Sequence, residues 1–348
     1  MINGFAPPVL APALAALLPL TGLAQHNGSG GGEPLLFASP VAAKGGTAFA
    51  NPIFGGADPH AAVFGSKVWI YPTSGGGFRH DRFYAYCSSD LKNWTRHGPV
   101  LDFNDVRWIQ DDGQRVHYAW APAIVARDGK FFFYYSVGPQ RETPARIGVA
   151  VGDNPAGPFK DSGRPLLTGG DGFEAIDPMV FPDPPSGRCY LYAGGSAGAT
   201  LRVFELGADM ITLAREIKVQ TPPRFTEGVF IHHYGGKYHL TYSHGRWSDA
   251  SYSVHYATAG SPTGPWDYRG VLLESDASRK GPGHHSIIQS PLNGEWLIVY
   301  HRWEGVEGDG PYRGSRQICI DRLEYDDKSF LKPVRMTGRT EANSKNGG

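Results

Sequence analysis

Residues 120–136 read WAPAIVARDGKFFFYYS, and four further segments of the chain share the design of this stretch. Each has a short polar or acidic start, an apolar run, a turn that contains glycine, and a second run rich in aromatic residues. The other four are residues 57–73 (ADPHAAVFGSKVWIYPT), 177–195 (DPMVFPDPPSGRCYLYAGG), 227–243 (EGVFIHHYGGKYHLTYS) and 284–302 (HHSIIQSPLNGEWLIVYHR). Two strand-length apolar runs on either side of such a turn predict a β-hairpin.

The spacing of the five hairpins predicts the architecture. Their starts are 62, 57, 50 and 57 residues apart, at Asp58, Trp120, Asp177, Glu227 and His284. A second hairpin follows within each unit, seen best in residues 146–167 and 253–273. Four strands in 50 to 60 residues is about the size of one propeller blade. We therefore predict an all-β, five-bladed β-propeller; a β-sandwich, the alternative, would not need five similar units.

Composition limits the partners of the chain. It has 348 residues, 41% hydrophobic and 19% charged, which is typical of a globular protein. Lys plus Arg equals Asp plus Glu at 33 each, so no excess of basic residues favours nucleic acid or an acidic membrane surface. A neutral oligosaccharide or polysaccharide would suit such a surface. The three cysteines, Cys87, Cys189 and Cys319, are far apart and are expected to be buried free thiols.

The ends of the chain differ from its middle. Residues 9–23 are apolar and small residues precede Gln25, so residues 1–24 resemble a signal peptide, although the first five residues lack Lys and Arg. The run is short and broken by prolines, which disfavours a membrane span. We expect a periplasmic or secreted protein with a flexible linker at 25–45, a propeller at 46–330 and a C-terminal tail at 331–348.

Three acidic residues stand where blades begin. The innermost strands of a propeller surround one channel, so Asp58, Asp177 and Glu227 are expected to meet there. Hydrolysis of a glycosidic bond needs one carboxylic acid and one carboxylate, and a third carboxylate can raise the pKa of the acid. A single Asp before Pro is more often a turn residue, as expected for Asp183. The shared position of the three acids in their repeats favours catalysis.

The same residues carry a resemblance to glycoside hydrolase family 43. The matching motifs are Ala57-Asp58-Pro59, Trp120-Ala121-Pro122, Ile176-Asp177-Pro178, Glu227-Gly228 and Gly281-Pro282-Gly283-His284. The resemblance covers roughly residues 50 to 325 and implies a five-bladed propeller with an inverting mechanism. It also implies that Asp58 is the general base, that Glu227 is the general acid, and that Asp177 raises the pKa of the acid and orients it.

Other side chains are candidates for the pocket. Trp120, His244, Trp247, Arg302 and Arg316 could contact the sugar, although each has an ordinary packing or surface role as its alternative. His284 opens a central strand after a glycine-rich turn. By the resemblance it lies near the channel axis, where some relatives hold one calcium ion. Hydrogen bonding without a metal is an equally good interpretation of His284, and no cofactor is required.

These observations predict an exo-acting glycosidase on plant cell-wall or related glycans. An α-L-arabinofuranosidase is the first expectation. A β-D-xylosidase, an endo-arabinanase or a galactose-directed exo-glycosidase of the same family are the alternatives. The rival from another class is a carbohydrate-binding propeller without catalysis, which a missing carboxylate would favour; all three carboxylates are present.

Overall fold

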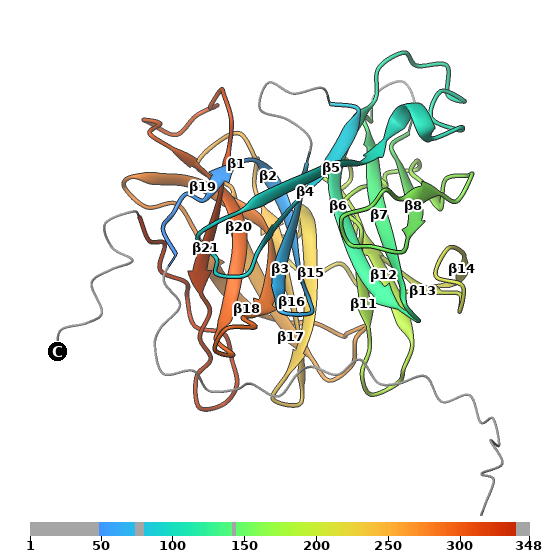
Figure 1. Ribbon diagram of the computed structural model, residues 1–348. Coiled ribbons are helices and arrows are strands. Elements are labelled where there is room, and N and C mark those ends of the chain that lie inside the picture. Colours follow the sequence, from blue (N-terminus) through green and yellow to red (C-terminus); the bar gives the residue numbers. More distant parts are fainter. Residues whose placement is uncertain (1–48, 74–79, 141–143, 339–348) are drawn as a thin grey trace, which may run out of the picture. The chain divides into compact units, whose positions relative to one another are not determined.

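The computed structural model describes residues 49–73, 80–140 and 144–338, which form five antiparallel sheets (Figure 1). The predicted signal peptide and linker lie outside these residues. Within the described ranges the one helical element is a short 3-10 helix, η1 (Phe103–Asp105). In this part of the chain no helix has the length and apolar character needed to cross a membrane.

Each sheet is one blade, built from strands that follow one another along the chain. Blade 1 contains β2 (Ala57–Phe64), β3 (Lys67–Thr73), β4 (Arg82–Ser88) and β5 (Thr95–Asp102). Blade 2 contains β6 (Tyr118–Arg127), β7 (Lys130–Gly138), β8 (Arg146–Gly152) and β10 (Leu167–Thr168), with β9 (Lys160–Asp161) also on β8. Blade 3 contains β11 (Met179–Pro182), β12 (Cys189–Ala193), β13 (Arg202–Leu206) and β14 (Leu213–Ile217). Blade 4 contains β15 (Glu227–Tyr234), β16 (Lys237–His244), β17 (Ser253–Ala259) and β18 (Asp267–Leu273).

Blade 5 joins the two ends of the propeller. It consists of β19 (Arg279–Gln289), β20 (Trp296–Glu304), β21 (Gln317–Arg322) and β1 (Phe54–Gly55). Because β1 precedes blade 1 and pairs with β21, the start of the propeller completes the last blade. The first strands of the blades contact one another in the circular order β2, β6, β11, β15, β19 and back to β2. The predicted five-bladed propeller is thereby confirmed.

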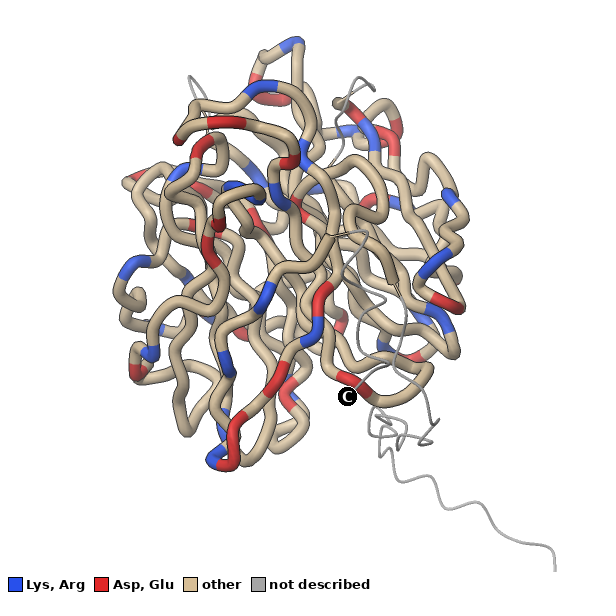
Figure 2. The backbone as a smooth tube through the Cα atoms, turned by 90° about the vertical axis from the view of Figure 1, so that its left-hand side faces the viewer, with Lys and Arg blue, Asp and Glu red and all other residues tan. Residues whose placement is uncertain are grey.

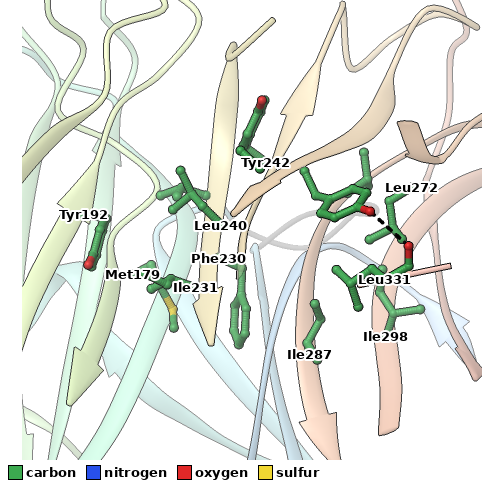
Figure 3. Close-up of a cluster of buried hydrophobic side chains, with 14 of the residues drawn as sticks. Met179, Tyr192, Phe230, Ile231, Leu240, Tyr242, Leu272, Ile287, Ile298 and Leu331 are labelled. Atoms are coloured by element: carbon green, nitrogen blue, oxygen red, sulfur yellow. Dashed lines mark hydrogen bonds between the residues drawn. The ribbon is translucent and has the colours of Figure 1, made fainter. Parts of the chain in front are cut away.

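Apolar side chains fill the spaces between blades. One cluster joins blades 3, 4 and 5, with Tyr192 from β12, Leu240 from β16 and Ile298 from β20 (Figure 3). A second cluster joins blades 1 and 2 through aromatic residues such as Phe83 and Phe133. Complete burial of such a side chain contributes about 1.5–3 kcal/mol. The aromatic-rich second runs of the repeats therefore hold neighbouring blades together.

Charges and thiols agree with the expectations from composition. Figure 2 shows lysine and arginine positions interspersed with aspartate and glutamate positions. Cys87, Cys189 and Cys319 are all buried free thiols.

Part of the expected C-terminal tail packs against the propeller. A tail was expected from residue 331, but residues 331–338 pack against blades 4 and 5. Leu331 and Met336 are buried, and the Val334 N–H donates to the Leu272 carbonyl at 2.8 Å. The Thr337 hydroxyl donates to Asp321 at 2.6 Å. The two apolar side chains anchor this segment, so only residues 339–348 of the expected tail lie outside the described part of the chain.

Candidate active site

A repeated β-bulge sets the geometry at one end of the channel. Near the start of each blade's first strand, one residue has left-handed backbone with positive φ. These residues are Asp58 (49°), Ala121 (31°), Asp177 (56°), Gly228 (61°) and His284 (38°). Four of the five are not glycine, and left-handed backbone costs such residues roughly 1–2 kcal/mol. The same turn in all five blades therefore reflects a constraint of the site rather than a local preference.

This register corrects one prediction from the repeats. Glu227 was expected to hold the same position as Asp58 and Asp177, but it precedes the bulge residue Gly228 by one. Its equivalents in the other blades are Ala57, Trp120, Ile176 and Gly283, because each directly precedes the bulge residue of its blade. Glu227 still lines the pocket, as do its equivalents Ala57, Trp120 and Ile176.

Side chains from one blade satisfy the bulge N–H of the next. The N–H groups of Ala121, Asp177 and His284 donate to the hydroxyl oxygens of Thr73 (2.7 Å), Ser136 (2.9 Å) and Ser243 (2.8 Å), respectively. The Asp58 N–H donates to Nδ1 of His301 in blade 5 at 3.0 Å. Each of these acceptors pairs with the residue before its own blade's bulge.

Blade 3 breaks the pattern in a way that involves an acid. At the equivalent position it carries Gly194, whose N–H donates to the Ile176 carbonyl at 3.1 Å. Gly194 offers no side-chain acceptor, and the Gly228 N–H donates instead to Asp177 Oδ2 at 2.9 Å. Asp177 therefore accepts the bulge N–H of blade 4, which a side chain at position 194 would otherwise accept.

The three acids line one pocket of about 550 Å³. Thr73 donates to Asp58 Oδ2 at 2.6 Å, and Nη1 of Arg316 lies 2.9 Å from Asp58 Oδ1. Burial alone would raise the pKa of Asp58, but Arg316, His284 and His301 outweigh burial and hold that pKa well below its usual range. Asp58 is therefore ionised at neutral pH.

Glu227 has the opposite electrostatic character. Burial raises the pKa of Glu227 to about 7; the hydrogen bond from Tyr252 lowers it, while the charges of Asp58 and Glu174 raise it. The Tyr252 hydroxyl donates to Glu227 Oε1 at 2.7 Å. Gly283 makes room for this tyrosine, since a Cβ on Gly283 would lie 2.1 Å from the Tyr252 ring. The glycine before His284 thus serves the orientation of Glu227.

Asp177 shares the charge environment of Glu227. Burial raises the pKa of Asp177, and the negative charges of Glu227, Asp58 and Glu174 raise it further. The hydrogen bond from the Gly228 N–H acts in the opposite direction. Asp177 and Glu227 therefore favour the uptake of a proton at pH values where Asp58 remains a carboxylate.

His284 lies between two of the acids. Its Nδ1 is 3.5 Å from Asp58 Oδ1 and 3.4 Å from Asp177 Oδ2. Burial lowers the pKa of His284 despite the opposing effect of Asp58. Across residues 49–73, 80–140 and 144–338, no three His, Cys, Asp or Glu side chains are arranged to hold a metal ion. Calcium also takes backbone carbonyls and waters as ligands, so a single calcium ion near His284 stays a prediction.

Three of the predicted sugar contacts line the pocket: Trp120, Trp247 and Arg316. Trp120 stacks on Tyr118, with ring centroids 5.9 Å apart. Trp247 is 46% exposed, and the Arg316 guanidinium lies 4.7 Å from its ring centroid. These aromatic faces can stack on a sugar ring, and the guanidinium can donate to hydroxyls.

Two predicted contacts lie elsewhere. Arg302 is 0% exposed and donates to Glu304, to the Tyr300 hydroxyl and to the Thr337 carbonyl, so it holds the C-terminal segment. His244 packs edge-on against His255. Successive strand residues face opposite ways. The neighbours of these two residues, His301 and Ser243, therefore cap the bulges.

Sequence reasoning missed Thr73, Tyr252, His301 and Glu174. One signal was available for the caps: the quoted segments of blades 1, 2 and 4 each end in a hydroxyl residue, namely Thr73, Ser136 and Ser243. The hydroxyl of Tyr252 and the carboxylate of Glu174 come from loops outside these segments, and no repeated pattern marks them. By contrast, Asp183 is the predicted turn residue, with its N–H donating to the Arg188 carbonyl across the hairpin turn.

Known proteins are similar to this chain in both sequence and fold. The model of the family described as Glycosyl hydrolases family 43 matches residues 49–330. A β-D-galactofuranosidase of Aspergillus niger is 36% identical over 82% of this chain and 85% of its own length. A xylosidase/arabinosidase of Bacteroides ovatus is 30% identical over 78% of this chain and 92% of its own. The crystal structure of a thermostable family-43 glycoside hydrolase superimposes with a TM-score of 0.70 at 27% identity, covering 84% of this chain and 97% of that one.

Proposed function

The chain belongs to glycosyl hydrolase family 43, and we propose that it removes terminal α-L-arabinofuranosyl residues from plant cell-wall or related glycans. It is an O-glycosyl hydrolase of an inverting family that needs no organic cofactor. The identity of the sugar, the exo-action and the roles of individual residues are the proposal.

In the proposed reaction one bond to the anomeric carbon forms and one breaks. Asp58 takes a proton from a water molecule whose oxygen attacks that carbon. Glu227 gives its proton to the glycosidic oxygen as the bond between this oxygen and the anomeric carbon breaks. Asp177, beside Glu227, keeps the acid protonated and in place. Trp120 and Trp247 supply faces for sugar rings.

One observation carries this assignment: the two working carboxyls have opposite pKa shifts in one pocket. Arg316 and the histidines keep Asp58 ionised, as a base requires. Burial raises the pKa of Glu227 to about 7, as an acid at neutral pH requires. Environments that separate the pKa values of two carboxyls are typical of general acid–base pairs. A carbohydrate-binding propeller without catalysis would not need this separation.

A β-D-galactofuranosyl substrate is the second candidate, favoured by the relative at 36% identity. Its ring has the same configuration as α-L-arabinofuranose, and it differs by one additional hydroxymethyl group on the exocyclic carbon. One pocket could therefore accept both sugars. The xylosidase/arabinosidase at 30% identity likewise keeps a β-D-xylosyl substrate among the alternatives.

The test is an assay of the purified chain on three 4-nitrophenyl glycosides: the α-L-arabinofuranoside, the β-D-galactofuranoside and the β-D-xylopyranoside. Arabinan and xylan are assayed beside them, and NMR follows the anomer released first. We expect the arabinofuranoside to be cleaved fastest, with inversion. Faster cleavage of another glycoside would replace the proposed sugar. Sugar binding without cleavage of any substrate would favour the binding propeller.

Variants assign the roles. Glu227→Ala and Asp58→Asn should each abolish activity on the polymers. The polymers are the decisive substrates, because activated aryl glycosides can partly bypass a missing acid. Asp183→Asn is the matched control, since Asp183 also precedes a proline but acts in a hairpin turn. Polymer activity of Glu227→Ala equal to that of the unaltered chain would refute the assignment of the acid.

We also propose that the enzyme works in the periplasm or outside the cell, in line with the signal-peptide pattern of residues 1–24. N-terminal sequencing of the protein from its native host should begin near Gln25. A chain that retains residues 1–24 would contradict export by cleavage.

A further inference from the structure

A fourth carboxylate lies in the pocket and neither gives nor takes a proton in the proposed reaction. Glu174 lines the pocket with Asp58, Asp177 and Glu227, and only 6% of its surface is exposed. It precedes Asp177 by three residues, in the segment that leads into blade 3. Burial of a carboxylate is costly unless its oxygens find partners. Its partners therefore indicate what it does.

The loop that follows β12 holds one oxygen of Glu174. Oε2 accepts a hydrogen bond from the Ala197 N–H at 2.8 Å and a longer one from the Ser196 hydroxyl at 3.5 Å. Gly195 leaves space for this oxygen, because a Cβ on Gly195 would lie 2.5 Å from Oε2. The carboxylate is therefore fixed by the backbone of a loop that fits around it.

The second oxygen accepts no hydrogen bond from the described residues. Oε1 therefore has its capacity for hydrogen bonds available, and Glu174 lines the same pocket as the three acids. A carboxylate can accept but not donate, and sugar hydroxyls are donors. Hydrogen bonds to a buried charged group are among the stronger ones in proteins.

We propose that Glu174 is a specificity-determining residue whose Oε1 accepts a hydrogen bond from a hydroxyl of the sugar at the non-reducing end. This inference rests on the proposed function and names the group that orients the sugar between Asp58 and Glu227. It also predicts discrimination, since a fixed negative charge favours hydroxylated neutral sugars over sugars that carry a carboxylate.

Binding without turnover gives the direct test. In the Asp58→Asn background, calorimetry measures the affinity for 4-nitrophenyl α-L-arabinofuranoside, with or without Glu174→Ala. We expect the alanine variant to weaken binding about 10- to 100-fold, as for loss of a hydrogen bond to a charged group. Glu174→Gln keeps an acceptor oxygen and should recover part of the affinity. Glu205→Ala, a carboxylate lost from β13 of the same blade outside the pocket, should have no effect.

Glycosides that each lack one hydroxyl identify the contact. In the Asp58→Asn background one such deoxy-glycoside should bind less tightly than the parent, and Glu174→Ala should abolish that difference. Equal affinities in the presence and absence of Glu174→Ala would overturn the proposal. The proposal would also be overturned if Glu174→Ala weakened binding and lowered the thermal midpoint while Glu174→Gln recovered no affinity. Glu174 would then stabilise the fold rather than contact the sugar. If the unaltered chain cleaves none of the glycosides, the proposed function fails, whereas the binding series still decides the role of Glu174.

Discussion

Tyr252 offers a sharp test of how the acid is tuned. Its hydroxyl is fully buried and donates to Glu227 Oε1 at 2.7 Å, which favours the ionised form of Glu227. Tyr252→Phe removes only this hydroxyl. A hydrogen bond to a charged group is worth about 1.5–3 kcal/mol, and one pKa unit corresponds to about 1.4 kcal/mol. The pKa of Glu227, about 7 in the unaltered enzyme, should therefore rise by about 1–2 units.

The assay is the pH dependence of kcat/KM, which reports the free enzyme's essential acid and base. As the proposed general acid, Glu227 is active when protonated, so activity should be present below its pKa and be lost as the pH rises through about 7. In Tyr252→Phe this alkaline limb should move to higher pH. Tyr242→Phe is the control, because Tyr242 is a buried tyrosine of the same blade whose hydroxyl donates to the Pro223 carbonyl. A limb that stays in place in Tyr252→Phe, or moves to lower pH, would refute this account of the acid.

Three further predictions concern Gly283, Asp177 and the buried histidines. Gly283→Ala should lower kcat at least about tenfold in a folded protein, because its Cβ displaces Tyr252, and kinetics beside a thermal melt would check this. Asp177→Asn and Asp177→Ala should both be inactive. Only the alanine variant should also lose about 1–2 kcal/mol in urea unfolding, since asparagine can still accept from the Gly228 N–H. The free energy of unfolding should fall as the pH drops from 6.5 towards 4, by up to about 1.4 kcal/mol per pH unit for each histidine that takes up a proton only when unfolded. Burial lowers the pKa to about 3–4 in His60, His239, His255, His285 and His301. The raised pKa values of Asp177, Glu227 and Asp321 offset part of this loss, and a rise in stability on acidification would contradict it.

The repeats could be predicted because every blade needs the same pattern of apolar and aromatic residues. A hairpin with an aromatic second strand must bury its side chains against the next blade, so its pattern recurs at regular spacing. Asp58 and Asp177 could be found in this way because they stand at the turn of the first strand. The position of Glu227 was predicted one residue out, since a bulge adds a residue to one strand without a compositional signal.

The partners of the acids could not be predicted for a related reason. Which side chain of a strand faces the channel depends on register, and a shift of one residue reverses the face. Arg302 was therefore chosen where His301 is the residue that contacts Asp58. Tyr252, which contacts Glu227, and Glu174, which lines the pocket, come from loops, whose course depends on contacts between distant parts of the chain.

The contacts between blade 5 and blade 1 make the surroundings of Asp58 depend on closure of the propeller. Asp58 lies near the start of the first blade, whereas the side chains that position its backbone and hold its charge, His301 and Arg316, lie 243 and 258 residues later in the chain. These partners reach Asp58 only when the last blade has closed on the first. The step that completes the ring therefore also completes the surroundings of the proposed base.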